Sequence, residues 1–145
     1  MAWTTDEAQA LLGEVFAPWV QALALRVSAI EETGARFVLP GNPELSRGGG
    51  AGGGVVCGQA IGAAADTCSV VALSALNGAF RPCTTVDMTT HFLRPLPDGE
   101  AEITVTALSN GRRMATTRVD VRGLVDGAPG KLSASATCAF AYLDL

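Results

Sequence analysis

The spacing of hydrophobic residues changes three times along the chain. Between residues 5 and 25 they recur every three or four positions, which predicts an amphipathic helix capped by Thr5 or Asp6 and kinked at Pro18. Its hydrophobic stripe consists of Leu11, Leu12, Val15, Phe16, Trp19, Val20 and Leu23. Hydrophobic and polar residues then alternate over residues 25–31 and 35–39, on either side of Glu-Thr-Gly, which predicts a first β-hairpin.

Residues 55–76 predict a second helix of a different kind. Its residues are small and apolar on nearly all sides, as is typical of a helix buried on most of its surface. The preceding residues, 40–54, are mostly Gly, Pro, Asn and Ser, a composition that predicts a loop. Small side chains on the helix would let a sheet approach it closely.

The C-terminal half predicts an antiparallel meander. Alternating stretches cover residues 83–94, 100–109, 112–121 and 131–142, and the turn sequences Pro97-Asp98-Gly99, Asn110-Gly111 and Asp126-Gly127 separate them. A buried helix followed by antiparallel strands indicates an α+β fold in which the sheet curls around the helix. We expect a single domain over residues 1–145.

The composition indicates how this domain exists in solution. Of 145 residues, 48% are hydrophobic and 17% are charged, and no apolar run reaches the roughly 20 residues of a membrane-spanning helix. We therefore expect a soluble protein without a membrane partner. Because one small core cannot hide this much apolar surface, we also expect a homo-oligomer.

Charge and cysteine spacing argue against several other classes of protein. A net charge of −4 without a Lys/Arg run argues against nucleic-acid binding. The acidic first residues lack the basic and apolar regions of a secretory signal, so we expect a cytoplasmic protein. No CxxC pair is present, so we expect neither a bound metal nor a disulfide, and four reduced thiols instead: Cys57, Cys68, Cys83 and Cys138.

Asp66 is the residue that most needs an explanation. It lies within an otherwise apolar helix, where an unpartnered carboxylate costs several kcal/mol. The functional interpretation is a general base or a nucleophile in a site that tunes its pKa. The structural interpretation is a carboxylate that faces a wet groove or accepts hydrogen bonds from its own helix.

The start of the same helix offers a second catalytic element. Backbone N–H groups near Gly58 have no partner within the helix and carry the positive end of its dipole, so they can polarise a carbonyl oxygen. Eight residues separate Gly58 from Asp66, which is about 12 Å along a helix. Since this is too far to act on one carbonyl, we expect Asp66 of one subunit to face Gly58 of another.

Two stretches resemble the hotdog-fold thioesterases of the PaaI-like group: GVVCGQAIGAAADT (residues 54–67) and TTVDMTTHFLRP (residues 84–95). The resemblance implies a hotdog fold, in which an antiparallel sheet wraps around a long central helix, here with an added N-terminal helix. It places Gly58 at the oxyanion glycine, Asp66 at the catalytic acid and Thr85 at the Ser or Thr that holds the water. Cys57 stands at the usual His, Gln59 at a second Gly, and Ala51 near a usual Asn or Gln.

The activity that the resemblance implies is hydrolysis of an acyl-CoA thioester by a homodimer or homotetramer with active sites at the subunit interface. Coenzyme A is part of the substrate, and no metal or other cofactor is expected. The acyl group is expected to be small and aromatic, or of short or medium chain length. Trp19, Phe80 and the Gly-rich loop are candidates for setting the depth of its pocket.

Three alternatives remain. The protein could bind acyl-CoA without turnover, a hypothesis that the replaced His motivates. It could be a hydratase or dehydratase, although His91 is the only histidine and is expected on a strand surface or an interface. Cys57 could be a covalent nucleophile at a helix start, but no partnering His and acid are evident.

The remaining candidates are charged residues outside the helix. Arginines bind phosphates well, so Arg94, Arg112, Arg113 and Arg118 could hold the phosphates of CoA, alongside Gln59 as a further substrate contact. For any single arginine, ordinary surface charge is the simpler interpretation. Asp87 alternates with Thr85 and Thr89, which predicts that these three side chains share one face of their strand.

Overall fold

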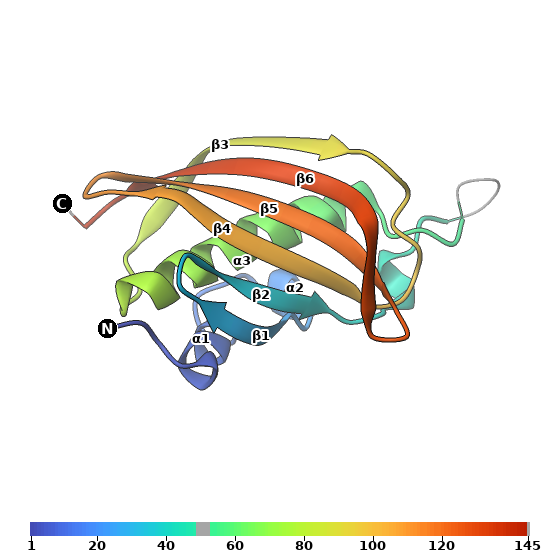
Figure 1. The fold of residues 1–145 in the computed structure, drawn as a ribbon, viewed down its shortest axis with the longest axis horizontal. Coiled ribbons are helices and arrows are strands. Elements are labelled where there is room, and N and C mark those ends of the chain that lie inside the picture. Colours follow the sequence, from blue (N-terminus) through green and yellow to red (C-terminus); the bar gives the residue numbers. More distant parts are fainter. Residues whose placement is uncertain (49–52, 145) are drawn as a thin grey trace.

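The computed structural model describes residues 1–48 and 53–144. One antiparallel sheet of six strands curls around the long helix α3 (Gly58–Asn77), in the strand order β1-β2-β4-β5-β6-β3 (Figure 1). The strands are β1 (Arg26–Glu31), β2 (Gly34–Leu39), β3 (Cys83–Phe92), β4 (Ala101–Asn110), β5 (Met114–Val125) and β6 (Ala128–Tyr142). The α+β class and the hotdog arrangement are confirmed.

Two of the predicted turns, Asn110-Gly111 and Asp126-Gly127, join neighbouring strands, so the meander is confirmed for β4, β5 and β6. The predicted hairpin at Pro97-Asp98-Gly99 is wrong, because β3 pairs with β6 at the far edge of the sheet and β4 pairs with β2. Asp126 and Gly127 both adopt positive φ, 52° and 77°, as a two-residue hairpin turn requires. Strands β5 and β6 therefore pair right up to this turn, where Val125 lies opposite Ala128. The sequence pattern ended the first of these strands too early, at residue 121, and began the second too late, at residue 131. Polar residues and glycines interrupt the alternation near the turn.

The prediction of one N-terminal helix reaching residue 25 is wrong. Helix α1 (Thr5–Leu12) ends at Gly13, and a separate short helix, α2 (Pro18–Gln21), begins at Pro18. Proline has no N–H to donate and fits the first position of a helix, so it starts a new helix here and does not kink an existing one. The cap is Thr4, one residue before the predicted Thr5, and it forms a reciprocal capping box with Glu7.

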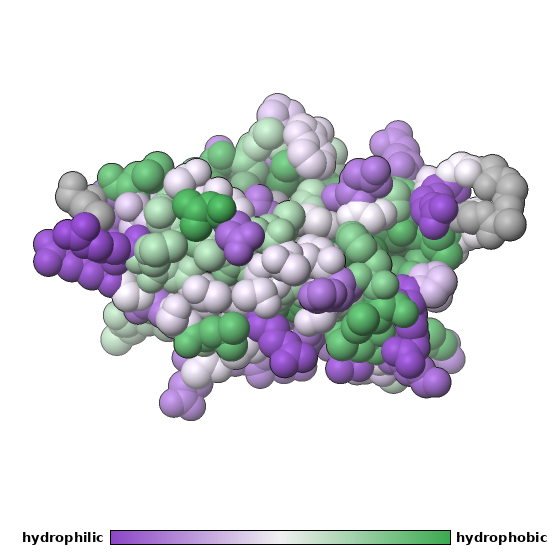
Figure 2. All heavy atoms as spheres, turned by 90° about the horizontal axis from the view of Figure 1, so that it is seen from above, coloured by the Kyte–Doolittle hydropathy of each residue, from purple (hydrophilic) through white to green (hydrophobic). Residues whose placement is uncertain are grey.

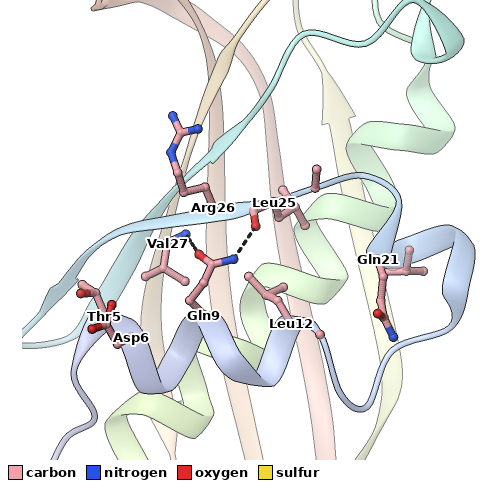
Figure 3. A pocket seen from close by; sticks show the side chains of 11 residues that line it. Thr5, Asp6, Gln9, Leu12, Gln21, Leu25, Arg26 and Val27 are labelled. Carbon is pink, nitrogen blue, oxygen red and sulfur yellow. Dashed lines mark hydrogen bonds between the residues drawn. The ribbon is translucent and has the colours of Figure 1, made fainter.

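Helix α1 is fixed to the outer edge of the sheet by a side chain. Gln9 donates to the carbonyl of Leu25 at 3.1 Å and accepts from the N–H of Val27 at 2.8 Å, so its amide pairs with β1 as a neighbouring strand would (Figure 3). An open cavity of about 630 Å³ lies between α1, α2 and β1 around this contact. Because Gln9 satisfies backbone groups at the β1 edge, that edge is protected from pairing with another chain.

Helix α3 lies in the concave side of the sheet (Figure 1). Its fully buried residues are small, which lets the strands approach closely: Ala64, Ala65, Cys68, Ser69, Val71 and Ala75. The hydroxyls of Ser69 and Thr117 form a hydrogen bond of 2.8 Å with each other in this interior. The helix ends at Gly78, whose φ of 69° gives the left-handed cap that favours glycine.

The predicted start of this helix, residue 55, is three residues too early. Val55 and Val56 form isolated β-bridges with Pro97 and Ser46, so the chain stays extended until Cys57. Within the preceding loop, one short 3-10 helix, η1 (Pro43–Leu45), is capped by Asn42. By length and composition alone α3 could cross a membrane, contrary to our reading of the sequence, but 67% of its apolar window is buried within the fold.

Candidate active site

Asp66 lies half-buried on α3, beneath strand β3 at the edge of the sheet. The hydroxyl of Thr85 on β3 donates a hydrogen bond of 2.7 Å to its Oδ1 atom. The ion pairs among the described residues do not include Asp66: Arg26–Glu100, Arg36–Glu31, Arg81–Asp144 and Arg118–Asp120. The structure thus brings together the two side chains that the sequence nominated, with a neutral hydroxyl as the donor.

Along the face of α3 that carries Asp66, the preceding residues are glycines. Gly58, Gly62 and Asp66 follow one another at intervals of four residues, so they form one stripe along the helix. A Cβ atom built at Gly62 would lie 3.9 Å from the Met88 side chain, and one at Gly58 would lie 3.3 Å from the Phe92 ring. The stripe therefore faces the inner side of β3.

An open groove follows this stripe. Its volume is about 850 Å³, and it is lined by Arg47, Gly48, Gly58, Gln59, Gly62, Met88, Thr90 and Phe92. The lining is mainly apolar, with the helix N-terminus at one end. Such a groove can hold an extended ligand whose carbonyl oxygen meets backbone N–H groups.

A β-bulge in β3 decides which side chains face this groove. Thr85 lies opposite Phe140 and Asp87 opposite Ala139, so Val86 is an extra residue without a partner. Phe140 is fully buried against the helix side, whereas Ala139 lies on the other face of the sheet. The prediction that Asp87 shares a face with Thr85 is therefore wrong, because the bulge reverses the alternation between them.

The first turn of α3 has the unpaired donors that the sequence predicts. The N–H groups of Val56 and Cys57 donate to the carbonyls of Leu96 and Leu45, which fixes the chain up to the helix start. The cap residue Cys57 makes no side-chain bond to the helix. Among residues 1–48 and 53–144, no acceptor is recorded for the N–H of Gly58 or Gln59. Ala51 lies outside the described residues.

Within one subunit, Gly58 and Asp66 do not meet. Both lie on α3, eight residues and about 12 Å apart. Asp66 has Thr85 beside it, whereas Gly58 has Phe92. A complete site with both groups on one carbonyl therefore needs a second subunit.

The four arginines considered for phosphate binding lie in different places. Arg94 lines a cavity of about 300 Å³ with Gly58 and Arg47 at the N-terminal end of α3. Arg112 and Arg113 lie near Arg81, after the other end of the helix, and Arg118 pairs with Asp120 at 3.2 Å. One subunit does not bring them together, and a phosphate-binding role for Arg112 and Arg113 stays a prediction.

Arg47 is the residue at this site that the sequence reasoning missed. It lines both the groove along α3 and the cavity that holds Arg94. Its position in a loop rich in Gly and Pro gave no periodic signal. The bridge between Ser46 and Val56, which brings the loop back to the start of α3, appears only in the fold.

The four cysteines are all free thiols, as predicted. Burial raises the pKa of Cys83, and the negative charge of nearby Asp66 raises it further. Burial also raises the pKa of Cys68 and Cys138. These three thiols are therefore held in the protonated, unreactive form at neutral pH.

Comparison with known proteins identifies the family and the fold. A family model described as the acyl-CoA thioesterase N-terminal domain matches residues 42–141. No curated protein matches the chain. One similar structure is a conserved protein of Pseudomonas aeruginosa, with a TM-score of 0.73, 25% identity, and coverage of 88% of this chain and 95% of that chain.

Two further structures share the fold at lower identity. A thioesterase from Haemophilus influenzae has a TM-score of 0.79 at 20% identity, covering 97% of this chain and 91% of that one. A thioesterase family protein from Silicibacter pomeroyi has a TM-score of 0.79 at 15% identity, covering 95% and 96%. The matched family model spans most of the chain, including Gly58, Asp66 and Thr85. The chain therefore belongs to the acyl-CoA thioesterase family of hotdog-fold proteins.

Proposed function

We propose that this protein hydrolyses the thioester bond of an acyl-CoA with a small aromatic or a short- to medium-chain acyl group. The observation that carries the proposal is the hydrogen bond of 2.7 Å from Thr85 to Asp66 beside an open groove. A carboxylate held by a hydroxyl, half-buried and without a cationic partner among the described residues, is suited to activate water.

The proposed reaction uses three groups. Asp66 takes a proton from a water molecule that Thr85 orients, and the water oxygen bonds to the thioester carbon. The N–H of Gly58 of the partner subunit, with the positive end of its helix, stabilises the oxyanion that forms. The carbon–sulfur bond then breaks, and the CoA thiolate takes up the proton. Direct attack by Asp66 is the alternative first step and uses the same carboxylate.

The unpaired edge of the sheet supports a second subunit. Among the described strands β3 pairs with β6 alone, and nearly all of its residues are exposed, including Met88 and Phe92, which line the groove. Its large hydrophobic side chains are more exposed than a stable monomer favours: Val86 51%, Met88 41% and Phe92 58%. In Figure 2, which views the molecule from above, hydrophobic groups lie among polar ones on the surface.

The substrate would enter along the groove toward the N-terminus of α3. Gln59 lies beside the proposed oxyanion site, and Arg47 and Arg94 lie nearby, where a CoA phosphate could pair with a guanidinium. The proposal requires no metal or other cofactor. A cytoplasmic location remains part of the proposal, because coenzyme A esters are intracellular metabolites.

One observation favours a second candidate, binding of acyl-CoA without turnover. Cys57, at the position where the resembled group often has His, gives the first turn of α3 no side-chain bond. A less well fixed helix start could bind a carbonyl oxygen without stabilising the transition state enough for reaction.

Release of free thiol from a panel of acyl-CoA esters distinguishes the two candidates. Wild-type protein should release CoA, and Asp66→Asn should reduce release at least about a thousandfold, because the amide cannot accept the proton. Asp126→Asn makes the same chemical change in a surface turn and should retain activity. If wild-type protein binds CoA esters and releases none, the binding candidate is correct.

A further inference from the structure

A small apolar cavity lies beside the proposed oxyanion site. Its volume is about 240 Å³, and its walls come from α2, η1 and the start of α3, including Trp19, Leu23, Leu45, Cys57 and Ala60. Leu23 and Ala60 are buried, whereas the Trp19 side chain is 63% exposed. The cavity thus has a fixed floor and one large aromatic wall open to solvent.

This cavity and the groove along α3 share one lining residue. Gln59 lines both, and Cys57 lines the cavity from the other side of Gly58. Because Gln59 and Cys57 flank Gly58 in the chain, a carbonyl oxygen on the Gly58 N–H would lie close to the cavity. A substituent on that carbonyl can extend into the cavity while the thioester sulfur points along the groove.

We propose that this cavity binds the acyl group of the substrate and selects a neutral group of about eight non-hydrogen atoms, a size estimated from roughly 30 Å³ per water-sized unit. This inference rests on the proposed function, since it takes Gly58 as the carbonyl site. A six-carbon chain or a single aromatic ring fills the space and covers the exposed Trp19. A sixteen-carbon chain leaves most of its apolar surface in water.

The rim of the cavity adds selection by charge. Glu44 lines it, and none of the described residues that line it is basic. Asn42, also on the rim, is engaged in accepting a bond of 2.9 Å from the Glu44 N–H. An acyl group that ends in a second carboxylate would therefore meet a like charge, with only the neutral amide donors of Asn42 and Gln59 to offset it.

Binding of non-hydrolysable thioethers tests the inference separately from catalysis. Titration calorimetry with S-hexyl-CoA and S-methyl-CoA measures the preference for the longer group in each variant. Ala22→Leu adds three carbons at an exposed position that lines the cavity and should reduce the preference about tenfold. Ala17→Leu is the matched control, because Ala17 is also exposed, begins the same short helix and lines none of the cavities described above.

The charge selection has its own test. Glu44→Gln should improve binding of S-(3-carboxypropyl)-CoA about fivefold and leave S-hexyl-CoA unchanged. An unchanged affinity for the carboxylated thioether would overturn the charge selection.

The outcomes separate this inference from the proposed function. An unchanged hexyl preference in Ala22→Leu would overturn the acyl cavity, even if Asp66-dependent hydrolysis is observed. Absence of hydrolysis, with a hexyl preference that Ala22→Leu removes, would overturn the proposed function and support the cavity as a binding site. Failure of wild-type protein to bind either thioether would overturn the acyl cavity, and thiol release would still decide the proposed function.

Discussion

Thr85 on the edge strand β3 holds the carboxylate of Asp66 on the central helix, at 2.7 Å across 19 residues of sequence. The β-bulge at Val86 determines which side chains of β3 face the helix, since it leaves Thr85 on the helix side and turns Asp87 to the other side of the sheet. Without the bulge, regular alternation would point the Asp87 side chain toward the helix, on the same side as Thr85 and near the Asp66 carboxylate. The bulge therefore leaves Asp66 with a neutral hydroxyl as its partner from β3 and keeps the Asp87 carboxylate away from it.

The contact predicts a graded effect at Thr85. Thr85→Val keeps the shape of the side chain and removes the donor, so kcat/KM for a reactive acyl-CoA should fall about ten- to hundredfold. Thr85→Ser keeps the hydroxyl and should stay within about threefold of wild type. Steady-state thiol release measures both, and equal activity of Thr85→Val and wild type would refute a role for the hydroxyl.

A cluster around Arg81 predicts how stability depends on pH. Arg81 binds both carboxylate oxygens of Asp144, at 2.8 and 2.9 Å, and its guanidinium lies 3.6 Å from the centre of the Tyr142 ring. The hydrogen bond from Arg81 lowers the pKa of Asp144 below its ordinary value of 3.8. The stabilisation by this ion pair is therefore complete above pH 3.8, and it is lost as the pH falls through the lower pKa that Asp144 has in the folded state.

The measurement for this cluster is thermal unfolding of wild type and Asp144→Asn. The variant should unfold at a lower temperature at pH 7, and the difference should shrink as pH falls below 3.8, where the wild-type carboxylate takes up a proton. A difference that is the same at pH 7 and pH 2.5 would show that the carboxylate charge is not responsible.

The backbone around Gly34 leaves no room for a side chain at this position. A Cβ atom at this residue would lie 1.8 Å from the carbonyl oxygen of Val105 on β4, and backbone atoms cannot move aside. Gly34→Ala should destabilise the fold by about 3 kcal/mol or more. Gly48→Ala is the control, because no atom of the described residues lies within 4 Å of the added carbon. Chemical denaturation checks both, and similar midpoints would contradict the close approach of β2 and β4.

The sequence predicted those parts of the fold that depend on local pattern. The small apolar residues of α3 and the turn residues after β4 and β5 define the helix and the last three strands with small errors at the ends. The place of β3 beside β6 was not predicted, because this pairing joins strands far apart in the sequence and leaves no local pattern. The N-terminal helix was mispredicted because its hydrophobic stripe continues past Gly13 and Pro18, where backbone chemistry ends one helix and starts another.

The candidate site was predictable in composition and less so in geometry. Asp66 stands out because a carboxylate in an apolar helix is costly, the start of that helix indicated Gly58, and the resemblance supplied Thr85. The bulge at Val86 has no sequence signal, since Thr-Val-Asp alternates like any regular strand. The cavity beside Cys57 depends on α2 and η1 packing against the start of α3, which is a long-range contact.

The central claim is that Asp66 of one subunit and Gly58 of another act on the same carbonyl, and complementation between two inactive variants tests it most directly. Asp66→Asn removes the base. Gly58→Pro removes the oxyanion N–H at the first position of α3, where proline fits a helix, and the preceding Cys57, at φ −67° and ψ 150°, is already in the conformation that proline favours.

Each variant alone should be inactive in thiol release. Refolding an equimolar mixture should restore about a quarter of wild-type activity, because half of randomly formed dimers are mixed and each mixed dimer holds one intact site of two. If the mixture is as inactive as the separate variants while mass spectrometry detects mixed dimers, the shared active site is contradicted.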